Sequence, residues 1–134
     1  MNRKIPNASV HHIAFAVSAF DKSKKFYTEG LGFTVHAEWL EGEDTRACLL
    51  DIGNGSCFEL FSNGSSAPQQ NEKVVHVALS TSDPDAAYNA ALAAGATTHM
   101  EPTDLTIPSS PAMPVRIAFV KGLDGELLEF FKAR

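Results

Sequence analysis

The sequence predicts an α+β fold made of two tandem modules, each with the element order βαβββ. Apolar runs of strand length alternate with turn-forming residues, and each half of the chain holds one segment with helical spacing. In addition, the order of elements in the first half recurs in the second. With 134 residues, the two modules together have the length of one ordinary domain.

The first predicted module spans residues 10–66 and begins after a tail at residues 1–9. Its run VHHIAFAV, residues 10–17, has the length and the β-branched content of a strand. Residues 18–32 are predicted as a helix, because large side chains recur at helical spacing and glycines end the segment. Three more strands are expected at residues 33–40, 46–52 and 56–62, because the turn sequences EGEDT and GNG separate them.

The second predicted module spans residues 74–134 and follows a polar linker at residues 67–73. Its first strand, VVHVALST, covers residues 74–81. An alanine-rich helix is expected over residues 82–95, because a Ser-Asp-Pro start and a terminal glycine bound it. Three further strands complete this module, at residues 97–102, 115–122 and 126–132.

The two modules repeat specific residues as well as element order. HHIAFAVSAFD can be aligned with VHVALSTSDPD so that His12 meets His76, and the glycines that end the helices then fall within one residue of each other. Glu59, in the last strand of the first module, corresponds to Glu129 in the last strand of the second. A duplicated unit thus carries one histidine and one glutamate at equivalent positions twice.

Because side chains alternate between the two faces of a strand, the two histidines and two glutamates are expected to have comparable surroundings. His12 shares a strand face with Ala14 and Ala16, which leave space, while the bulky face is expected to pack against the helix. His76 likewise shares its face with small residues. Each glutamate interrupts an apolar strand, where an ionised carboxylate is costly unless it finds a cation. The four side chains are therefore expected to enter one concave space.

Imidazole nitrogens and carboxylate oxygens are the ligands that zinc, nickel, cobalt, manganese and iron(II) accept. The sequence therefore predicts one divalent metal ion per site, held by His12, Glu59, His76 and Glu129. A four-ligand set without thiolate leaves coordination positions open for water. Such a site favours catalysis over a purely structural role.

Four other titratable residues compete for these positions. Strand alternation places His11 on the packed face, away from His12. His36 and His99 occupy matching strands of the two modules and are interpreted as surface or pocket-rim residues. Glu126 follows the turn sequence LDG and is expected to be solvated.

Composition excludes several classes of function. The net charge is −5, and the chain has no block of basic residues beyond DKSKK, so neither nucleic acid nor a membrane surface is an expected partner. No apolar stretch approaches the roughly 18–20 residues that span a bilayer, and the N-terminus lacks the apolar core of a signal peptide. A cytoplasmic location is expected, with Cys48 and Cys57 as free core thiols.

The chain resembles the vicinal oxygen chelate superfamily, which includes glyoxalase I, methylmalonyl-CoA epimerase, extradiol dioxygenases and the bleomycin- and fosfomycin-resistance proteins. HHIAFAVSAFDKSKKFYTEGLGF is similar to the opening signature of that family, and VKGLDGELLEFF is similar to its closing strand, with Leu123 where proline is common. The resemblance implies a glyoxalase-like pair of half-barrels around a metal cavity. It also implies that the four predicted ligands fall on the metal positions of glyoxalase I and the epimerase.

Glyoxalase I is the nearest activity by this resemblance. Asn63, four residues after Glu59, matches an asparagine that glyoxalase I uses to hold glutathione. Ala16 stands where that enzyme has an arginine, so a glutathione carboxylate would lack this cation. Residues 63–73 and 103–114 are expected to flank the cavity mouth and to determine specificity.

The predicted reaction is a lyase or isomerase step, in which a proton moves next to a carbonyl of a 2-oxoaldehyde adduct or related thioester. Glu129 or Glu59 is the expected general base. The alternatives are a pocket that sequesters a small molecule such as an antibiotic, an iron(II) extradiol-type dioxygenase, and thiol transfer to an epoxide. The last would need clustered cations, but Arg46, Lys73 and Arg116 are scattered. A homodimer is expected, because half-barrels leave sheet edges and apolar surface to cover.

Overall fold

The computed structural model describes residues 3–4, 10–67, 76–109 and 111–134. Contacts divide the chain into a first unit, Met1–Thr28 with Gly32–Gly64, and a second unit, Glu29–Leu31 with Ser65–Arg134. Most of the predicted tail and linker, and the start of the strand predicted at residues 74–81, lie outside the described residues. Within the described ranges, no helix has the length and apolar character needed to cross a bilayer.

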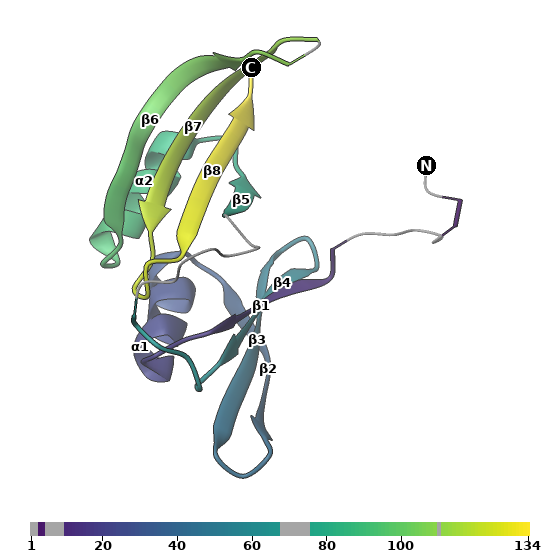
Figure 1. The fold of residues 1–134 in the computed structure, drawn as a ribbon, viewed down its shortest axis with the longest axis vertical. Helices are drawn as coiled ribbons and strands as arrows, with labels where there is room; N and C mark the ends of the chain where they lie inside the picture. The colour runs from purple at the N-terminus through teal and green to yellow at the C-terminus, as the bar shows by residue number, and fades with distance from the viewer. Residues whose placement is uncertain (1–2, 5–9, 68–75, 110) are drawn as a thin grey trace. The chain divides into compact units, whose positions relative to one another are not determined.

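The first unit contains a four-stranded sheet in the order β1-β4-β3-β2 and a helical segment that follows β1 (Figure 1). Strand β1 runs parallel to β4, and the other neighbouring pairs are antiparallel. The elements are β1 (His12–Ala16), α1 (Phe20–Lys25), a π-helical turn (Phe26–Gly30), β2 (Thr34–Glu41), β3 (Thr45–Gly53) and β4 (Ser56–Phe61).

The second unit repeats this topology, with the sheet order β5-β8-β7-β6 and β5 parallel to β8. Its helix α2 packs against β6, β7 and β8. The elements are β5 (Val77–Ser80), α2 (Pro84–Ala93), β6 (Thr97–Ile107), β7 (Met113–Lys121) and β8 (Leu127–Ala133). The prediction of an α+β fold with two βαβββ modules is confirmed.

The helical segments account for the one-residue mismatch between the repeats. The first has one residue more than the second before its terminal glycine, and a π-helical turn at Phe26–Gly30 takes up this residue. Gly32 and Gly95 then end the two segments with φ of 81° and 112°, a backbone region that favours glycine. The single helix predicted at residues 18–32 is therefore an α-helix continued by a π turn.

Aromatic side chains form much of the core of the first unit. Tyr27 from the π turn stacks on Phe33 at 5.6 Å between ring centroids, and both meet Phe58 of β4 edge-on at 5.3 Å. Phe15 of β1 reaches the same ring at 5.1 Å. Phe58 is fully buried, so the face of β4 opposite Glu59 is fixed by this cluster.

A duplicated ion pair ties each helix to its sheet. Arg46 of β3 lies 3.0 Å from Asp21 in the first turn of α1, and Arg116 of β7 makes two hydrogen bonds of 2.6 and 2.7 Å to Asp85 in the first turn of α2. Both arginine side chains therefore form ion pairs with carboxylates at the start of a helix. Lys73, the third cation weighed for thiol transfer, lies outside the described residues.

The loop predicted at residues 103–114 is shorter in the structure. Strand β6 continues to Ile107 and β7 begins at Met113, so the connection covers residues 108–112. The extension is held by the pairing of Asp104 with Arg116, whose side chains also lie 3.1 Å apart. Leu105 and Ile107 are half-buried and alternate with the exposed residues Asp104 and Thr106, which also suits a strand.

Gly64 marks a close approach of two backbones in the first unit. A Cβ atom added there would lie 2.2 Å from the carbonyl carbon of Ala16 and 2.4 Å from the nitrogen of Val17. The Gly64 N–H donates a hydrogen bond to the Val17 carbonyl at 3.0 Å. The segment after β4 is thus held against the end of β1 by a contact that only glycine permits.

We predict that Gly64→Ala destabilises the protein by about 1–3 kcal/mol, because backbone atoms rather than a flexible side chain must move. Urea unfolding followed by circular dichroism measures the change. Ser66→Ala, at a nearby exposed position, should unfold like the wild type. Equal midpoints for Gly64→Ala and the wild type would show that the two backbones are not held this closely.

We also predict that Asp85→Asn weakens the dependence of stability on acid pH. The hydrogen bond from Arg116 lowers the pKa of Asp85, so the ionised carboxylate stabilises the fold above its unfolded pKa of about 3.9. This contribution is lost as the pH falls through the lower pKa of the folded state.

Thermal unfolding measured from neutral to acid pH tests this prediction. The Asp85→Asn variant should be less stable at neutral pH and should lose less stability than the wild type on acidification. Asp44→Asn, in the exposed turn between β2 and β3, serves as the control. Parallel curves for Asp85→Asn and the wild type would contradict the role of the ion pair.

Candidate functional site

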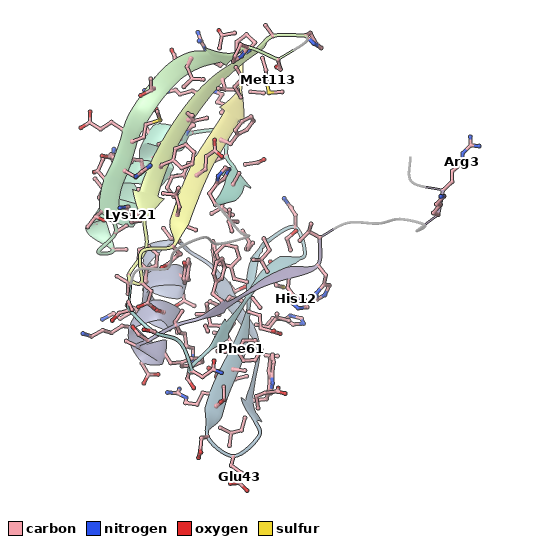
Figure 2. All side chains as sticks on the ribbon, viewed as in Figure 1. Arg3, His12, Glu43, Phe61, Met113 and Lys121 are labelled. Atoms are coloured by element: carbon pink, nitrogen blue, oxygen red, sulfur yellow. The ribbon has the colours of Figure 1, made fainter. Side chains whose placement is uncertain are left out.

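Strand β1 presents alternating faces, as the sequence predicts. Ile13 and Phe15 are the less exposed residues of the strand, whereas His12, Ala14 and Ala16 are exposed. Figure 2 labels His12 on this strand, away from the helix. In the second unit Val77 is buried, while His76, Ala78 and Ser80 are exposed. Both histidines therefore lie on the face with small residues.

In the first unit the β1–β4 ladder brings His12 near Glu59. Ala14 is the Cα partner of Glu59, and His12 is the partner of Cys57, two residues earlier in β4. The Nε2 atom of His12 lies 4.0 Å from Oε1 of Glu59, with side-chain exposures of 42% and 15%. This separation is too long for a hydrogen bond, so the two groups face each other without one.

The second unit contains the equivalent pair in closer contact. The Nε2 atom of His76 lies 3.0 Å from Oε2 of Glu129, and the side chains are 39% and 10% exposed. Ala78 is the Cα partner of Glu129, as Ala14 is of Glu59. The glutamate in the apolar strand thus has an imidazole as its partner, on the open face of the sheet.

Each pair supplies one imidazole nitrogen and one carboxylate oxygen that face each other, which are suitable donors for a divalent transition metal. Within the described residues, no group of three or more histidine, cysteine, aspartate or glutamate side chains is gathered in a metal-binding arrangement. Each unit provides one pair only. Four ligands on one ion would require both units to contribute.

The two pairs differ in what holds the histidine ring. His76 meets Phe119 edge-on at 5.4 Å between ring centroids, with an interplanar angle of 90°. Phe119 is the Cα partner of Glu129, and Leu49 is the corresponding partner of Glu59. Phe119 was not identified from the sequence, because only the pairing of β7 with β8 reveals its place beside the pair.

His36 and His99 are each the extra residue of a β-bulge. The β2–β3 register shifts between Val35 and Ala37, and the β6–β7 register shifts between Thr98 and Met100. The ring of His99 meets Phe119 at 5.9 Å, on the same aromatic side chain as His76. Bulges redirect side chains, so His99 reaches the neighbourhood of the pair although the simple alternation does not predict it.

The prediction for His11 is wrong. This residue is exposed and does not lie on the packed face. It precedes β1, where strand alternation no longer applies, and its Nδ1 atom lies 2.9 Å from Nδ1 of His12. Its backbone carbonyl still accepts a hydrogen bond from Cys57 N–H at 2.9 Å.

Glu126 is also placed differently from the expectation of a solvated carboxylate. Its side chain is partly buried and accepts a hydrogen bond from the backbone N–H of Asp124 at 3.0 Å. The carboxylate therefore stabilises the turn before β8.

Asn63 is exposed in the segment that follows β4. The adjacent Gly64 packs on the backbone of Ala16, so Asn63 and Ala16 lie at the same end of the sheet in the first unit. Both substrate positions suggested by the sequence are thus at the end of β1 beyond His12.

Cys48 and Cys57 are buried and free, as expected. Burial raises the pKa of both thiols, most directly through loss of solvation. A raised pKa disfavours the thiolate, which is the nucleophilic form. Neither cysteine has the environment of a catalytic nucleophile.

Comparison with known proteins supports a family assignment over the length of the chain. Residues 9–130 match the family model of the Glyoxalase/Bleomycin resistance protein/Dioxygenase superfamily. The uncharacterized protein YaeR of Escherichia coli (strain K12) is 31% identical over 131 residues, which cover 92% of this chain and 95% of that protein.

Solved structures share the fold at lower identity. A mutant glyoxalase I from Zea mays has a TM-score of 0.69 and 19% identity, with coverage of 91% of this chain and 43% of that one. TnmS3, an antibiotic binding protein from Streptomyces sp. CB03234, has a TM-score of 0.72 and 21% identity, with coverage of 97% and 99%. The family match and these folds agree: the chain belongs to the Glyoxalase/Bleomycin resistance protein/Dioxygenase superfamily.

Proposed function

We propose that this protein is a metal-dependent enzyme of the glyoxalase type, which moves a proton next to a carbonyl of a small 2-oxoaldehyde adduct or related thioester. The observation that carries the proposal is the duplicated His–Glu pair on the open face of each sheet. Each glutamate lies among the apolar residues of its strand, at a position where packing alone would favour an apolar side chain.

His12, Glu59, His76 and Glu129 are the residues that would hold one divalent ion of nickel, zinc, cobalt, manganese or iron(II). A divalent ion is common in this superfamily. When bound, such an ion polarises a carbonyl oxygen and stabilises negative charge that develops there. The donor set fits this group, since both carboxylates already face an imidazole nitrogen.

Glu129 is the proposed general base. Its side chain is only 10% exposed, and its carboxylate lies 3.0 Å from Nε2 of His76. A carboxylate held within reach of the substrate carbon can accept its proton as a general base. Glu129 would take that proton and return it to the neighbouring carbon. Glu59, which is equivalent in the first unit, is the second candidate for this role.

The residues near the end of β1 indicate which kind of substrate the site would accept. Ala16 offers no cation for a glutathione carboxylate, whereas the exposed Asn63 amide can donate and accept hydrogen bonds. We therefore expect the thiol part of the substrate to be neutral, or smaller than glutathione. A hemithioacetal or an epimerisable thioester remains compatible with the carbonyl chemistry proposed above.

A second candidate function is the sequestration of a small molecule without chemistry. Phe119 favours it, because its ring meets both His76 and His99 beside the Glu129 pair and could bind an aromatic ligand. The antibiotic binding protein TnmS3 shares the fold. This function predicts ligand binding that persists after a chelator has removed all metal.

We also expect a homodimer in solution. Val35 and Leu40 are exposed on β2, which is an edge strand of its sheet, and a partner subunit would cover them. Multi-angle light scattering measures this directly.

The first prediction from this proposal concerns metal content. Protein purified without a metal-affinity tag should contain about one transition metal ion for each set of four ligands, measured by elemental analysis. His12→Ala and Glu129→Ala should each lose most of the metal, because each removes one of four ligands. Protein that stays metal-free after reconstitution with nickel, zinc, cobalt, manganese and iron(II) would favour the sequestration function instead.

The second prediction concerns the general base. Glu129→Gln should lower turnover by roughly 10²–10⁴-fold and keep most of the bound metal, because the amide retains an oxygen but cannot take the proton. Activity is measured on hemithioacetals of methylglyoxal with several thiols and on epimerisable thioesters. Glu101→Gln, at an exposed position in the same unit, is the matched control. Full activity of Glu129→Gln on a confirmed substrate would remove Glu129 from this role.

A further inference from the structure

The open face of the first sheet, which carries His12 and Glu59, is built from rows of side chains that cross the four strands. One row contains the carboxylate: Ala14, Glu59, Leu49 and Ala37 are Cα partners in turn. Directly paired residues place their side chains on the same face of a sheet. Two residues along each strand the alternation returns to this face, so a second row lies beside the first.

The second row contains two aromatic side chains. Its members are Ala16, Phe61, Ala47 and Trp39, and each is again the Cα partner of the next. Phe61, which Figure 2 labels on this sheet, and Trp39 are half-buried, so part of each side chain stays open to solvent. Ala16 and Ala47 add only methyl groups. The two aromatic rings therefore determine the chemical character of this row.

The indole of Trp39 is oriented by its own strand. Its Nε1–H donates a hydrogen bond to Oε2 of Glu41 at 2.8 Å. Because this polar group is already used, the indole offers its apolar ring faces to a ligand. Trp39 is also the single tryptophan of the chain, so its fluorescence reports on this row alone.

The second unit lacks this pair of aromatic residues. In its corresponding row, Phe131 pairs with Ile117, and Ile117 pairs with Thr103. Thr103 thus stands where the first unit has Trp39. The tryptophan is a difference between two halves that repeat the His–Glu pair and the helix-to-sheet ion pair.

The open face of the first sheet also presents carboxylates and no cation from its strands. Arg46 is the one lysine or arginine in strands β1–β4, all of which the structure describes, and it pairs with Asp21 of the helix on the opposite face. Strand pairing places Asp51 and Glu41 on the same face as Glu59. A ligand that carries carboxylates, such as glutathione, would meet like charge on these strands.

We propose that Trp39 and Phe61 form an aromatic subsite, which binds a neutral aromatic thiol portion of the substrate. This inference rests on the proposed function and names the class of thiol that the reaction would use. Phe61 follows Glu59 by two residues on the same face, about 7 Å along the strand, so a group joined through sulfur to the reacting carbon can reach the rings. Aromatic side chains bind flat apolar groups by offset stacking or edge contacts. An arylmethyl thiol such as benzyl mercaptan has the required chemistry.

Probe binding to the metal-free protein tests the subsite without any reaction. The probes are three unreactive thioethers: 2-(benzylthio)ethanol, its aliphatic analogue 2-(ethylthio)ethanol, and the anionic S-methylglutathione. The benzyl probe should change the fluorescence of Trp39 saturably and, by calorimetry, should bind about 10-fold more tightly than the other two. No saturable change with the benzyl probe, or equal affinity for all three, would overturn the inference.

Calorimetry on variants identifies the residues responsible. Trp39→Thr, which copies the residue of the second unit, should weaken binding of the benzyl probe about 10-fold. Phe61→Leu, which removes a ring but keeps an apolar side chain, should weaken it as well. Glu38→Thr, at the adjacent exposed position on the other face of β2, is the matched control and should bind like the wild type. Wild-type affinity in Trp39→Thr and Phe61→Leu, with folding confirmed by urea unfolding, would refute the subsite.

Turnover separates this inference from the proposed function. With hemithioacetals of methylglyoxal, the metal-loaded protein should prefer benzyl mercaptan to glutathione, and Trp39→Thr should raise KM for the benzyl adduct with little change in kcat. Equal turnover of both adducts would refute the aromatic subsite and leave the proposed reaction intact. Absence of turnover, together with tight binding of the benzyl probe at Trp39, would refute the proposed reaction and leave the subsite intact.

Discussion

Each unit of this protein places a carboxylate inside an otherwise apolar strand, and this constraint determines what must lie beside it. Glu59 and Glu129 lie in strands whose neighbouring side chains are buried, and an ionised carboxylate there must find a compensating partner. In both units the partner is an imidazole contributed by the parallel edge strand. The small residues Ala14 and Ala78 beside the glutamates keep that face open. On this sheet face, polar imidazole and carboxylate groups take the place of apolar packing. Such departures from core packing are typical of functional sites.

Duplication produced two similar halves that now differ in detail. The helix-to-sheet ion pairs Asp21–Arg46 and Asp85–Arg116 are repeated, so the scaffold is conserved between the halves. The contacts behind the histidines are not repeated, since His12 has an imidazole neighbour and His76 has an aromatic ring. The histidine of the first pair therefore lies beside a second imidazole, and the histidine of the second pair lies beside an aromatic ring.

The fold could be predicted from the sequence because its signals are local. Apolar runs, turn residues and terminal glycines identify the two modules, and the repeat of His12 and Glu59 at His76 and Glu129 identifies the pairs. The sequence does not reveal the surroundings of residues whose place depends on strand pairing. His11 precedes the strand, His99 occupies a bulge, and Phe119 meets the site only through the register of β7 with β8. Register and bulges arise from tertiary packing, which alternation in a single strand cannot reveal.

The proposed metal site requires that the two His–Glu pairs share one ion. A crystal structure of the metal-loaded protein, with anomalous diffraction recorded at the absorption edge of the metal, tests it most directly. We expect one strong anomalous peak bounded by His12, Glu59, His76 and Glu129, whether these come from one chain or from two. Separate peaks at each pair, or a single peak bound to other residues, would contradict it.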